Sequence, residues 1–284
     1  MFGLPVRELI RHPVNAISYL ASDPMQIVLT VQDEYAAVRE AKGPPCQYEF
    51  DPEWEKRLHE ALGLEWPCPA AAEFQEFWPR LIRELRDKGI DAGPLAFQWW
   101  NDGDAGLSRS IWCLTRHLAP GRIIETGVAH GVTSRCILEA VKRNGSGHLW
   151  SIDLPPIERY WREQVGIAVG DDFADLWTYI AGSSRRRLPK LLAALGHVDL
   201  FVHDSLHSER NVSFELGCAW AALAPGGAIV ADDVDASWGL HSFRQSVPVA
   251  QSFVCEAEVS RPDTRRFNQK GLFAVLLKPR PTRQ

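Results

Sequence analysis

The stretch RIIETGVAHGVTS, residues 122–134, decides the fold of this chain. A short run rich in isoleucine leads into a turn that contains Gly127 and Gly131, and the helix-like sequence SRCILEAVKRN follows at 134–144. This pattern predicts a strand, a tight turn and a helix. Glycine lets the turn approach a ligand closely, and the first N–H groups of the helix are free to bind an anionic group. A nucleotide-type site is therefore predicted, although a merely tight turn would look the same.

The alternation of β-rich runs and helical segments continues to the end of the chain. We expect strands at RIIETG, HLWSID, LWTYIAG, VDLFVHD, GAIVAD, SFVCEAEV and GLFAVLLK, with helices at 134–144, 188–196, 209–223 and near 242–248. Parallel strands joined by crossover helices give a doubly wound α/β sheet. The last two runs are joined only by RPDTRRFNQK, which is too short for a crossover helix. They are therefore predicted to form an antiparallel hairpin.

The first third of the chain has a different character. Helical periodicity runs from Glu73 to Gly89, and the turn formers NDGDAGLS at 101–108 mark a boundary. We therefore divide the chain into a helical N-terminal extension, residues 1–105, and an α/β domain, residues 106–284. The extension is expected to cover the substrate side of the sheet. The sequence leaves open whether its apolar face packs on its own domain or on a second copy in a homo-oligomer.

Composition excludes several classes of protein. The 284 residues are 45% hydrophobic and 24% charged, which is typical of a globular protein. Because 31 Lys and Arg stand against 36 Asp and Glu, no basic excess is present to bind a nucleic-acid backbone. No apolar run is long enough to span a membrane. The six cysteines contain no CxxC pair and are expected to be reduced and buried, as in a soluble cytoplasmic protein.

Four aspartates follow the predicted strands. Asp153 closes the second strand, where a carboxylate can bind both hydroxyls of a ribose or simply cap a helix. Asp204 closes the fourth strand, and Asp232 and Asp233 close the fifth. Such a cluster of like charges favours a hard cation such as Mg²⁺. Alternatively, Asp204 bonds a loop and the other two form a capped turn. Both Asp232 and Asp233 can ligate only if the chain has already turned there.

Three histidines lie close to these acids. His207, three residues after Asp204, could accept a proton as a general base, support Asp204, or lie on the surface. His203 directly precedes Asp204 and should point to the opposite face. His130 lies within the glycine turn and is expected to border the cofactor site rather than perform chemistry.

A run of three arginines, residues 185–187, follows the third strand. We expect it to be a solvated loop before a helix that begins at Pro189, because proline is favoured in a first helical turn. Binding of an anionic substrate is the alternative.

The turn does not match the dinucleotide fingerprint G-x-G-x-x-G, and the acidic residue that ends its strand suits a ligand with a cationic end. The stretches ETGVAHGVTS, LWSIDLPP, DLWTYIAGSSRRRLPKLL, VDLFVHDSLHS and LAPGGAIVADDVD resemble, in order, the class I S-adenosylmethionine-dependent methyltransferases. The resemblance covers roughly residues 110–278. Within that superfamily the chain is similar to the metal-dependent O-methyltransferases of small molecules.

The resemblance implies a set of site residues. The methionine part of S-adenosylmethionine would be surrounded by Glu125, Gly127, Gly131 and Ser134. Asp153 would hold the ribose, Gly182 and Ser183 would lie near the adenine, and Asp204 would contact both cofactor and metal. Asp204, Asp232 and Asp233 would bind Mg²⁺.

The expected reaction is transfer of the methyl group to a hydroxyl of a small molecule, either a natural product or a saccharide. A metal ion held by Asp204, Asp232 and Asp233 would polarise the hydroxyl and fix its orientation, while His207 would take the proton. Two alternatives remain open at this stage: a methyltransferase that needs no metal, and a noncatalytic module that binds the cofactor. A nicotinamide-dependent oxidoreductase is disfavoured because its glycine fingerprint is missing.

Overall fold

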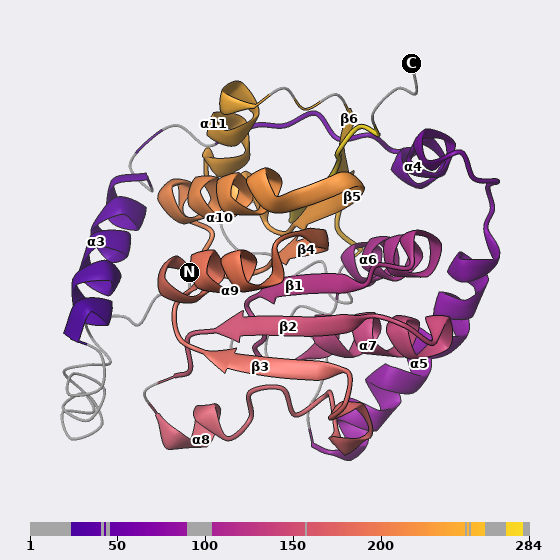
Figure 1. Ribbon diagram of the computed structural model, residues 1–284, viewed down its shortest axis with the longest axis horizontal. Coiled ribbons are helices and arrows are strands. Elements are labelled where there is room, and N and C mark those ends of the chain that lie inside the picture. Colours follow the sequence, from indigo (N-terminus) through magenta and orange to yellow (C-terminus); the bar gives the residue numbers. More distant parts are fainter. Residues whose placement is uncertain are drawn as a thin grey trace.

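One sheet of seven strands runs through the centre of the computed structural model of the chain (Figure 1). The structure describes residues 24–40, 43, 46–89, 104–156, 158–247, 249, 251–258 and 271–280. The strand order in the sheet is β3-β2-β1-β4-β5-β7-β6. The strands are β1 (Arg122–Thr126), β2 (His148–Asp153), β3 (Trp177–Ala181), β4 (Val198–His203), β5 (Leu223–Ala231), β6 (Gln251–Glu256) and β7 (Leu272–Leu277).

The strand directions confirm the predicted fold class. β1 pairs in parallel with β2 and β4, β2 with β3, and β4 with β5, whereas β7 runs antiparallel to both β5 and β6. The last two strands are therefore an antiparallel hairpin, as predicted. The central strands β1 and β4 are almost entirely buried because helices cover both sides of the sheet.

Helices pack on the two faces of this sheet, and others lie outside them (Figure 1). They are α3 (Pro24–Glu40), α4 (Trp54–Leu62), α5 (Pro69–Asp87), α6 (Ala105–Leu118), α7 (Val132–Asn144), α8 (Arg159–Arg162), α9 (Ser184–Leu195), α10 (Glu209–Ala222) and α11 (Gly239–Ser246). Short 3₁₀ turns, η1 (Asp171–Phe173) and η2 (Val234–Ala236), complete the described elements.

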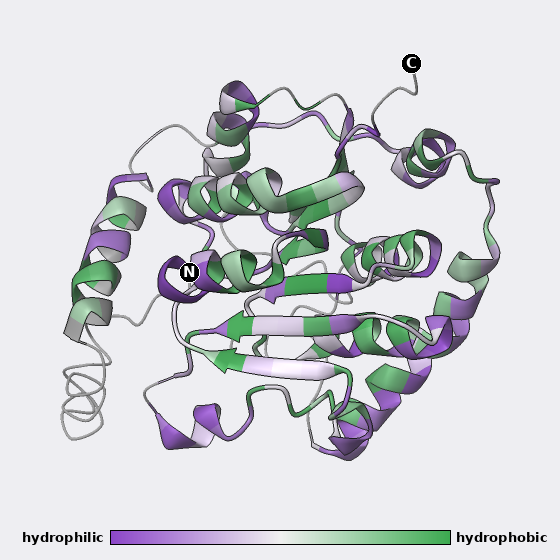
Figure 2. Ribbon diagram, viewed as in Figure 1, coloured by the Kyte–Doolittle hydropathy of each residue, from purple (hydrophilic) through white to green (hydrophobic). Residues whose placement is uncertain are grey.

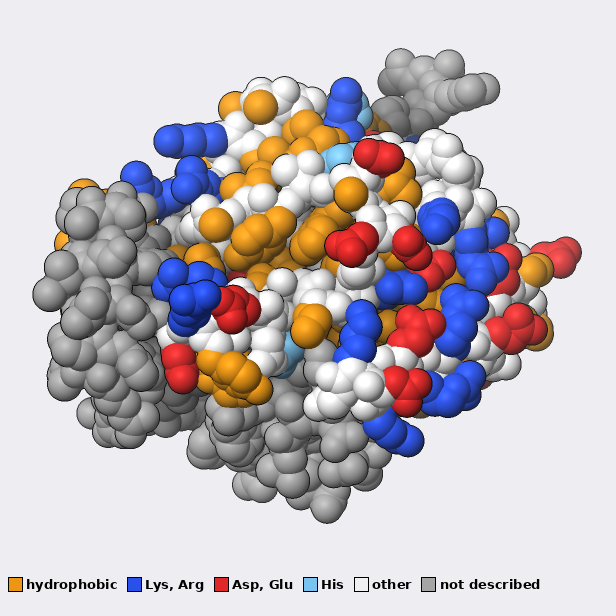
Figure 3. Space-filling view, turned by 90° about the horizontal axis from the view of Figure 1, so that it is seen from below, with side chains coloured by type: hydrophobic (Ala, Val, Ile, Leu, Met, Phe, Trp, Pro, Cys, Tyr) orange, Lys and Arg blue, Asp and Glu red, His pale blue; other side chains and the backbone are white. Residues whose placement is uncertain are grey.

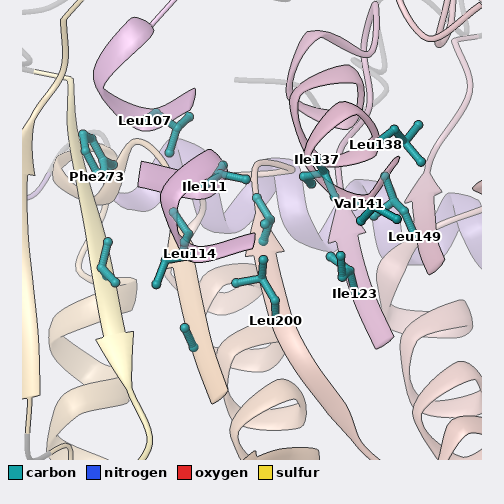
Figure 4. Packing of buried hydrophobic residues seen from close by; sticks show 14 of the residues in the cluster. Leu107, Ile111, Leu114, Ile123, Ile137, Leu138, Val141, Leu149, Leu200 and Phe273 are labelled. Atoms are coloured by element: carbon teal, nitrogen blue, oxygen red, sulfur yellow. The ribbon is translucent and has the colours of Figure 1, made fainter. Parts of the chain in front are cut away.

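The core is divided by the sheet into two halves. On one side, side chains of α6 and α7 interdigitate with those of the strands, as Figure 4 shows for Leu107, Ile111, Ile137, Leu149 and Leu200. On the other side, a second cluster joins the strands to α9, α10 and α11. Figure 2 shows green hydrophobic segments in β1 and β5, paler ones in β2 and β3, and a mixture of green and purple along the helices.

The N-terminal region has two described parts that lie on different sides of the molecule. α5 packs outside α6 and α7, where its buried aromatic residues form a third cluster. α3 packs against α10 on the opposite side. An ion pair of 3.6 Å joins Asp33 of α3 to Arg185 at the start of α9. Since helices α9 and α10 begin where β3 and β4 end, α3 lies next to the carboxyl edge of the sheet on this side.

The interpretation of residues 185–187 as a solvated loop is wrong. α9 already begins at Ser184, so Pro189 lies inside the helix and does not start it. The guanidinium of Arg185 is largely buried, since it lies 4.9 Å from the ring centroid of Phe214 and pairs with Asp33. Contacts with α3 and α10 stabilise this first turn of α9. The sequence around residues 184–189 alone does not predict these contacts.

Near β3, an edge strand, the described residues form no large surface patch of charges of one sign (Figure 3). Seen from below, hydrophobic side chains gather in the middle of this face, and basic and acidic side chains are mixed around them (Figure 3). Among the described residues, none of the helices combines the length and the apolar character that a membrane span requires.

Candidate functional site

Four neighbouring strands end at the same level, and the sequence-predicted site residues follow directly after them. Thr126 of β1 lies beside Ile152 of β2 and His203 of β4, and His203 in turn lies beside Ala231 of β5. The last residue of each of these strands, and the residue that follows it, therefore lie at one edge of the sheet. In open α/β sheets a ligand binds at this edge, where the chain order reverses between the first and fourth strands.

The loop after β1 is shaped by glycine. Gly127 has a φ of 87°, and a Cβ atom there would lie 1.8 Å from the carbonyl oxygen of Asp204. At Gly131, with a φ of 81°, a Cβ would lie 3.0 Å from the Cα of Gly166. Both positions therefore require glycine, the first because β4 continues directly alongside and the second because residues 164–169 fold over the loop. The loop conformation prepares the start of α7, whose N-cap is Gly131.

Glu125 is fully buried beneath this loop. Its Oε2 accepts hydrogen bonds from the hydroxyls of Ser134, at 2.6 Å, and Ser151, at 2.7 Å. Burial raises the pKa of Glu125 to about 7, although the two hydroxyls oppose this effect. Its Oε1 has no hydrogen-bond partner among the described residues. Ser134 thus serves to hold Glu125 here, and direct contact of either residue with a cofactor stays a prediction.

The second and third strands contribute Asp153 and Ser183. The Oδ2 of Asp153 accepts a bond of 3.3 Å from the backbone N–H of Ala129 in the glycine loop, and the N–H of Gly182 donates to its carbonyl oxygen at 2.8 Å. Burial raises the pKa of Asp153 to about 6, and the loop N–H groups limit the increase. The hydroxyl of Ser183 is buried and has no partner among the described residues. The structure thus brings Asp153, Gly182 and Ser183 together around one corner of the edge.

His207 lies between two of the predicted carboxylates. Its Nε2 is 4.0 Å from Oδ1 of Asp204 and 3.8 Å from Oδ2 of Asp233. Only 10% of the His207 side chain is exposed, against 31% for Asp204 and 38% for Asp233. Burial, and then the neighbouring His203, keep the pKa of His207 well below its ordinary value. The imidazole is therefore neutral at pH 7 and can accept a proton, whereas the two carboxylates face solvent.

The chain does turn at the end of β5, as joint use of Asp232 and Asp233 requires. The N–H of Asp232 still continues the β4–β5 pairing, because it donates to the carbonyl oxygen of His203 at 2.8 Å. Asp233, the next residue, has a φ of 47°, in the left-handed region. Yet the carboxylates of Asp204, Asp232 and Asp233 do not form a compact set of three metal ligands. In the described residues only one group of three or more potential ligands has all its ligand atoms within 4.8 Å, and it lies elsewhere.

Sequence reasoning missed a buried polar network behind the site. Glu215 of α10 is fully buried, and its Oε2 accepts from Nδ1 of His203 at 2.6 Å and from Oγ1 of Thr126 at 2.5 Å. Its Oε1 accepts from Ser205 at 2.8 Å and from Asn211 at 2.9 Å. This one carboxylate thus ties the ends of β1 and β4 to α10. His203 is fully buried against Glu215 of α10, and its ring centroid is only 5.4 Å from that of His207.

Comparison with known proteins agrees with this architecture. A family model described as "Methyltransferase domain" matches residues 124–234. That range begins in β1 and ends in η2, so it includes the glycine loop and the residues that follow β2, β3, β4 and β5. No curated protein sequence matches the chain.

Three solved structures illustrate the similarity. The O-methyltransferase TomG from Streptomyces achromogenes, in complex with S-adenosylmethionine, is 15% identical with a TM-score of 0.49, over 71% of this chain and 89% of TomG. An O-methyltransferase from Bacillus cereus in complex with S-adenosylhomocysteine is 10% identical with a TM-score of 0.49, over 78% and 97%. PaMTH1 from Podospora anserina, bound to S-adenosylhomocysteine, is 15% identical with a TM-score of 0.45, over 83% and 100%.

Likeness at this level assigns neither a cofactor nor an acceptor. The family match over residues 124–234 and the strand order are the stronger findings, and they agree with the resemblance of the sequence motifs. Residues 124–234 of this chain thus match a methyltransferase domain, and the sheet around them has the doubly wound architecture described above.

Proposed function

We propose that the protein transfers a methyl group from S-adenosylmethionine to a hydroxyl group of a small molecule, with His207 as general base. The observation that carries this proposal is the neutral, buried imidazole of His207 at the edge of the sheet, flanked by the carboxylates of Asp204 and Asp233. A hydroxyl group attacks poorly until its proton is removed, and a neutral imidazole in this position suits that task.

The cofactor side of the proposal rests on the first three strand ends. S-adenosylmethionine, when bound, supplies an electrophilic methyl group on a sulfonium. We propose that the carboxylate of Asp153 accepts hydrogen bonds from the ribose hydroxyls and that the unpaired hydroxyl of Ser183 bonds the adenine. Glu125 would face the cationic end with its unpartnered Oε1, and that positive charge would favour the ionised carboxylate over the protonated form that burial promotes. Gly127 and Gly131 leave room for the methionine part.

Substitution of Asp153 tests the cofactor site. Asp153→Ala should weaken binding of S-adenosylhomocysteine at least about tenfold, which corresponds to about 1.4 kcal/mol, because the ribose loses a charged acceptor. Since the pKa of Asp153 is about 6, affinity in the wild type should also fall as the pH is lowered through 6, when the carboxylate becomes protonated. Isothermal titration calorimetry measures both effects. The exposed Asp172→Ala is the control, and equal affinity in the two variants would remove the ribose assignment.

Mg²⁺ is the second part of the proposal. Asp204 and Asp233 offer carboxylate oxygens that are open to solvent on both sides of Nε2 of His207, and Mg²⁺ in enzymes often combines one or two carboxylates with water and substrate oxygens. These two residues would hold the ion, with Asp232 at the adjacent position, and a bound Mg²⁺ would lower the pKa of a substrate hydroxyl. The spread of the three carboxylates favours the alternative, a methyltransferase that relies on His207 alone.

Calorimetric titration with MgCl₂ distinguishes these two versions. If the ion binds here, Asp204→Ala should lower Mg²⁺ affinity at least about tenfold because half of the carboxylate pair is lost. The exposed Asp175→Ala should bind like the wild type. If the wild type binds no Mg²⁺ in the presence of S-adenosylhomocysteine, the magnesium site is contradicted and the metal-independent mechanism is supported.

The acceptor is proposed to be a small hydroxylated natural product or a saccharide. We also propose that residues 1–105 form an extension whose helix α3 covers the substrate side, with 106–284 as the catalytic domain. Support comes from α3, whose Asp33 and Glu40 bond residues at the starts of α9 and α10 beside the edge. Residues 90–103 lie outside the described part of the chain, and the proposed boundary falls just after them, at the first residue of α6 (Ala105–Leu118). All six cysteines are free, which supports a location in the reducing cytoplasm.

A further inference from the structure

Two thiols and two imidazoles meet inside the protein, away from the site described above. His59 of α4, Cys68 at the N-cap of α5 and Cys113 of α6 are all buried, and one ligand atom from each lies within 4.8 Å of the other two. Nε2 of His59 is 3.0 Å from Sγ of Cys68, which is 4.0 Å from Sγ of Cys113. The ring centroid of His117, also in α6, is 5.3 Å from that of His59.

We propose that His59, Cys68, Cys113 and His117 bind one zinc ion, which fastens α4 and α5 to the methyltransferase domain. Two sulfur and two nitrogen ligands in tetrahedral arrangement are diagnostic of zinc among the common metals. With Zn–S bonds of about 2.3 Å, the two sulfurs of such a site lie about 3.8 Å apart. The observed 4.0 Å between Cys68 and Cys113 is close to that separation.

The helices present these ligands on facing surfaces. Cys113 and His117 are four residues apart on α6 and therefore lie on the same face of the helix. Arg109 precedes them by one more turn on that face, and its guanidinium binds the carboxylate of Glu55, four residues before His59 on α4. The two helices are thus held in register by an ion pair one turn away from the proposed site. In Figure 1, α4 and α5 lie on the same side of the sheet as α6.

The hydrogen bonds around the cluster leave the ligand atoms available. Nδ1 of His59 lies 2.6 Å from the carbonyl oxygen of Glu55, to which it donates, so Nε2 carries a lone pair toward Cys68. Metal-binding histidines are commonly oriented in this way by a carbonyl acceptor. Nε2 of His117 is buried and has no hydrogen-bond partner among the described residues. A metal ion would satisfy both nitrogen atoms.

The chemistry of the cluster also favours a metal ion. Sγ of Cys68, Sγ of Cys113 and Nε2 of His59 are buried together, and sulfur and imidazole ligands of this kind suit zinc. Zn²⁺ with two thiolates is neutral overall. A Cys68–Cys113 disulfide would instead leave two buried imidazole nitrogens without a partner.

Because four protein ligands close the coordination sphere, the role is structural and not catalytic. The location agrees with this: α6 ends at Leu118, just before β1 begins, so the cluster lies toward the end of the sheet opposite the glycine loop. The proposal is independent of the acceptor and of Mg²⁺ at the carboxyl edge.

Metal analysis of the full-length protein, purified without chelators or added metal, tests the proposal. Inductively coupled plasma mass spectrometry should find about one zinc ion per chain. Cys113→Ser and His117→Gln should lose it, whereas the matched controls Cys218→Ser and His197→Gln should retain it. Removal of zinc from the wild type should lower its melting temperature, and Zn²⁺ but not Mg²⁺ should restore it.

A second measurement does not depend on folding of the variants. Wild type reconstituted with Co²⁺ should show the intense visible bands of tetrahedral cobalt together with thiolate-to-cobalt charge transfer. The proposal is overturned if reduced wild type contains no zinc and gives no such spectrum, or if Cys218→Ser loses as much metal as Cys113→Ser. An intact mass that reports a Cys68–Cys113 disulfide in freshly purified protein would overturn it as well.

Discussion

Replacement of His207 by alanine is expected to lower turnover by about two to four powers of ten, the usual contribution of a general base. The loss should appear in kcat, with little change in the affinity for S-adenosylhomocysteine, because His207 lies with Asp204 and Asp233 at the ends of β4 and β5 and not in the glycine loop. The measurement requires an acceptor, which a screen of phenols, alcohols and saccharides can identify by the S-adenosylhomocysteine that is formed.

The pH dependence gives the assignment a second test. Burial lowers the pKa of His207, so the imidazole stays unprotonated as the pH falls below the ordinary histidine value of about 6.5. Activity of the wild type should therefore persist below that pH and fall only at more acidic values. His197→Ala is the matched control because His197 lies before β4, at the opposite end of the same strand. Full activity of His207→Ala would identify the protein as one that does not use this base.

Much of the fold could be predicted because its signals are local. Each parallel strand is a short apolar run, and each crossover helix follows a turn with polar or glycine residues. The alternation of strands and helices can therefore be recognised without knowledge of tertiary contacts. The antiparallel hairpin of β6 and β7 followed from the length of its connection alone. The start of α9 was missed because Arg185 is stabilised by Asp33, a residue about 150 positions earlier.

The edge of the sheet was predictable for a similar reason. Asp153 is the last residue of its strand, and Asp204 and Asp232 each follow the last residue of theirs. Because the parallel strands are in register, these residues lie at the same edge of the sheet. Distances between their side chains were not predictable, since they depend on turns such as the left-handed one at Asp233. The close approach of Gly127 to Asp204 also depends on how two strands pair, which local sequence does not encode.

The thiol–imidazole cluster shows where sequence reasoning fails. Cys68 and Cys113 are far apart in the chain and have no CxxC spacing, so each resembles an ordinary buried cysteine. Only the packing of α4 and α5 against α6 brings them together with His59. One local signal was available: Cys113 and His117 are four residues apart in a helix, a spacing that permits two ligands on one face.

The second large effect is expected for Glu215, whose removal should destabilise the folded protein. Glu215→Ala leaves the four donors around its carboxylate without an acceptor. A buried donor without its acceptor costs about 1–3 kcal/mol, so a total loss of about 3–5 kcal/mol is expected. For a chain of this size that corresponds to a decrease in melting temperature of roughly 6–20 °C. Differential scanning calorimetry measures it, with Glu76→Gln on the exposed face of α5 as the control. A change within about 1 °C would contradict the role assigned to the network.

The same carboxylate predicts how stability depends on pH. Interactions with His203, and then with Ser184 and Thr126, outweigh burial and lower the pKa of Glu215 from 4.5 to about 2. A carboxyl group with a lowered pKa in the folded state stabilises that state fully above its unfolded pKa and loses the effect as the pH falls toward its folded pKa. Its contribution, about 3 kcal/mol from that difference, should therefore disappear between pH 4.5 and 2. Wild type and Glu215→Ala should consequently differ most in urea midpoint at pH 6 to 7, and their midpoints should approach each other as the pH falls below 4.5. Parallel curves at all pH values would mean that Glu215 acts through packing and not through its charge.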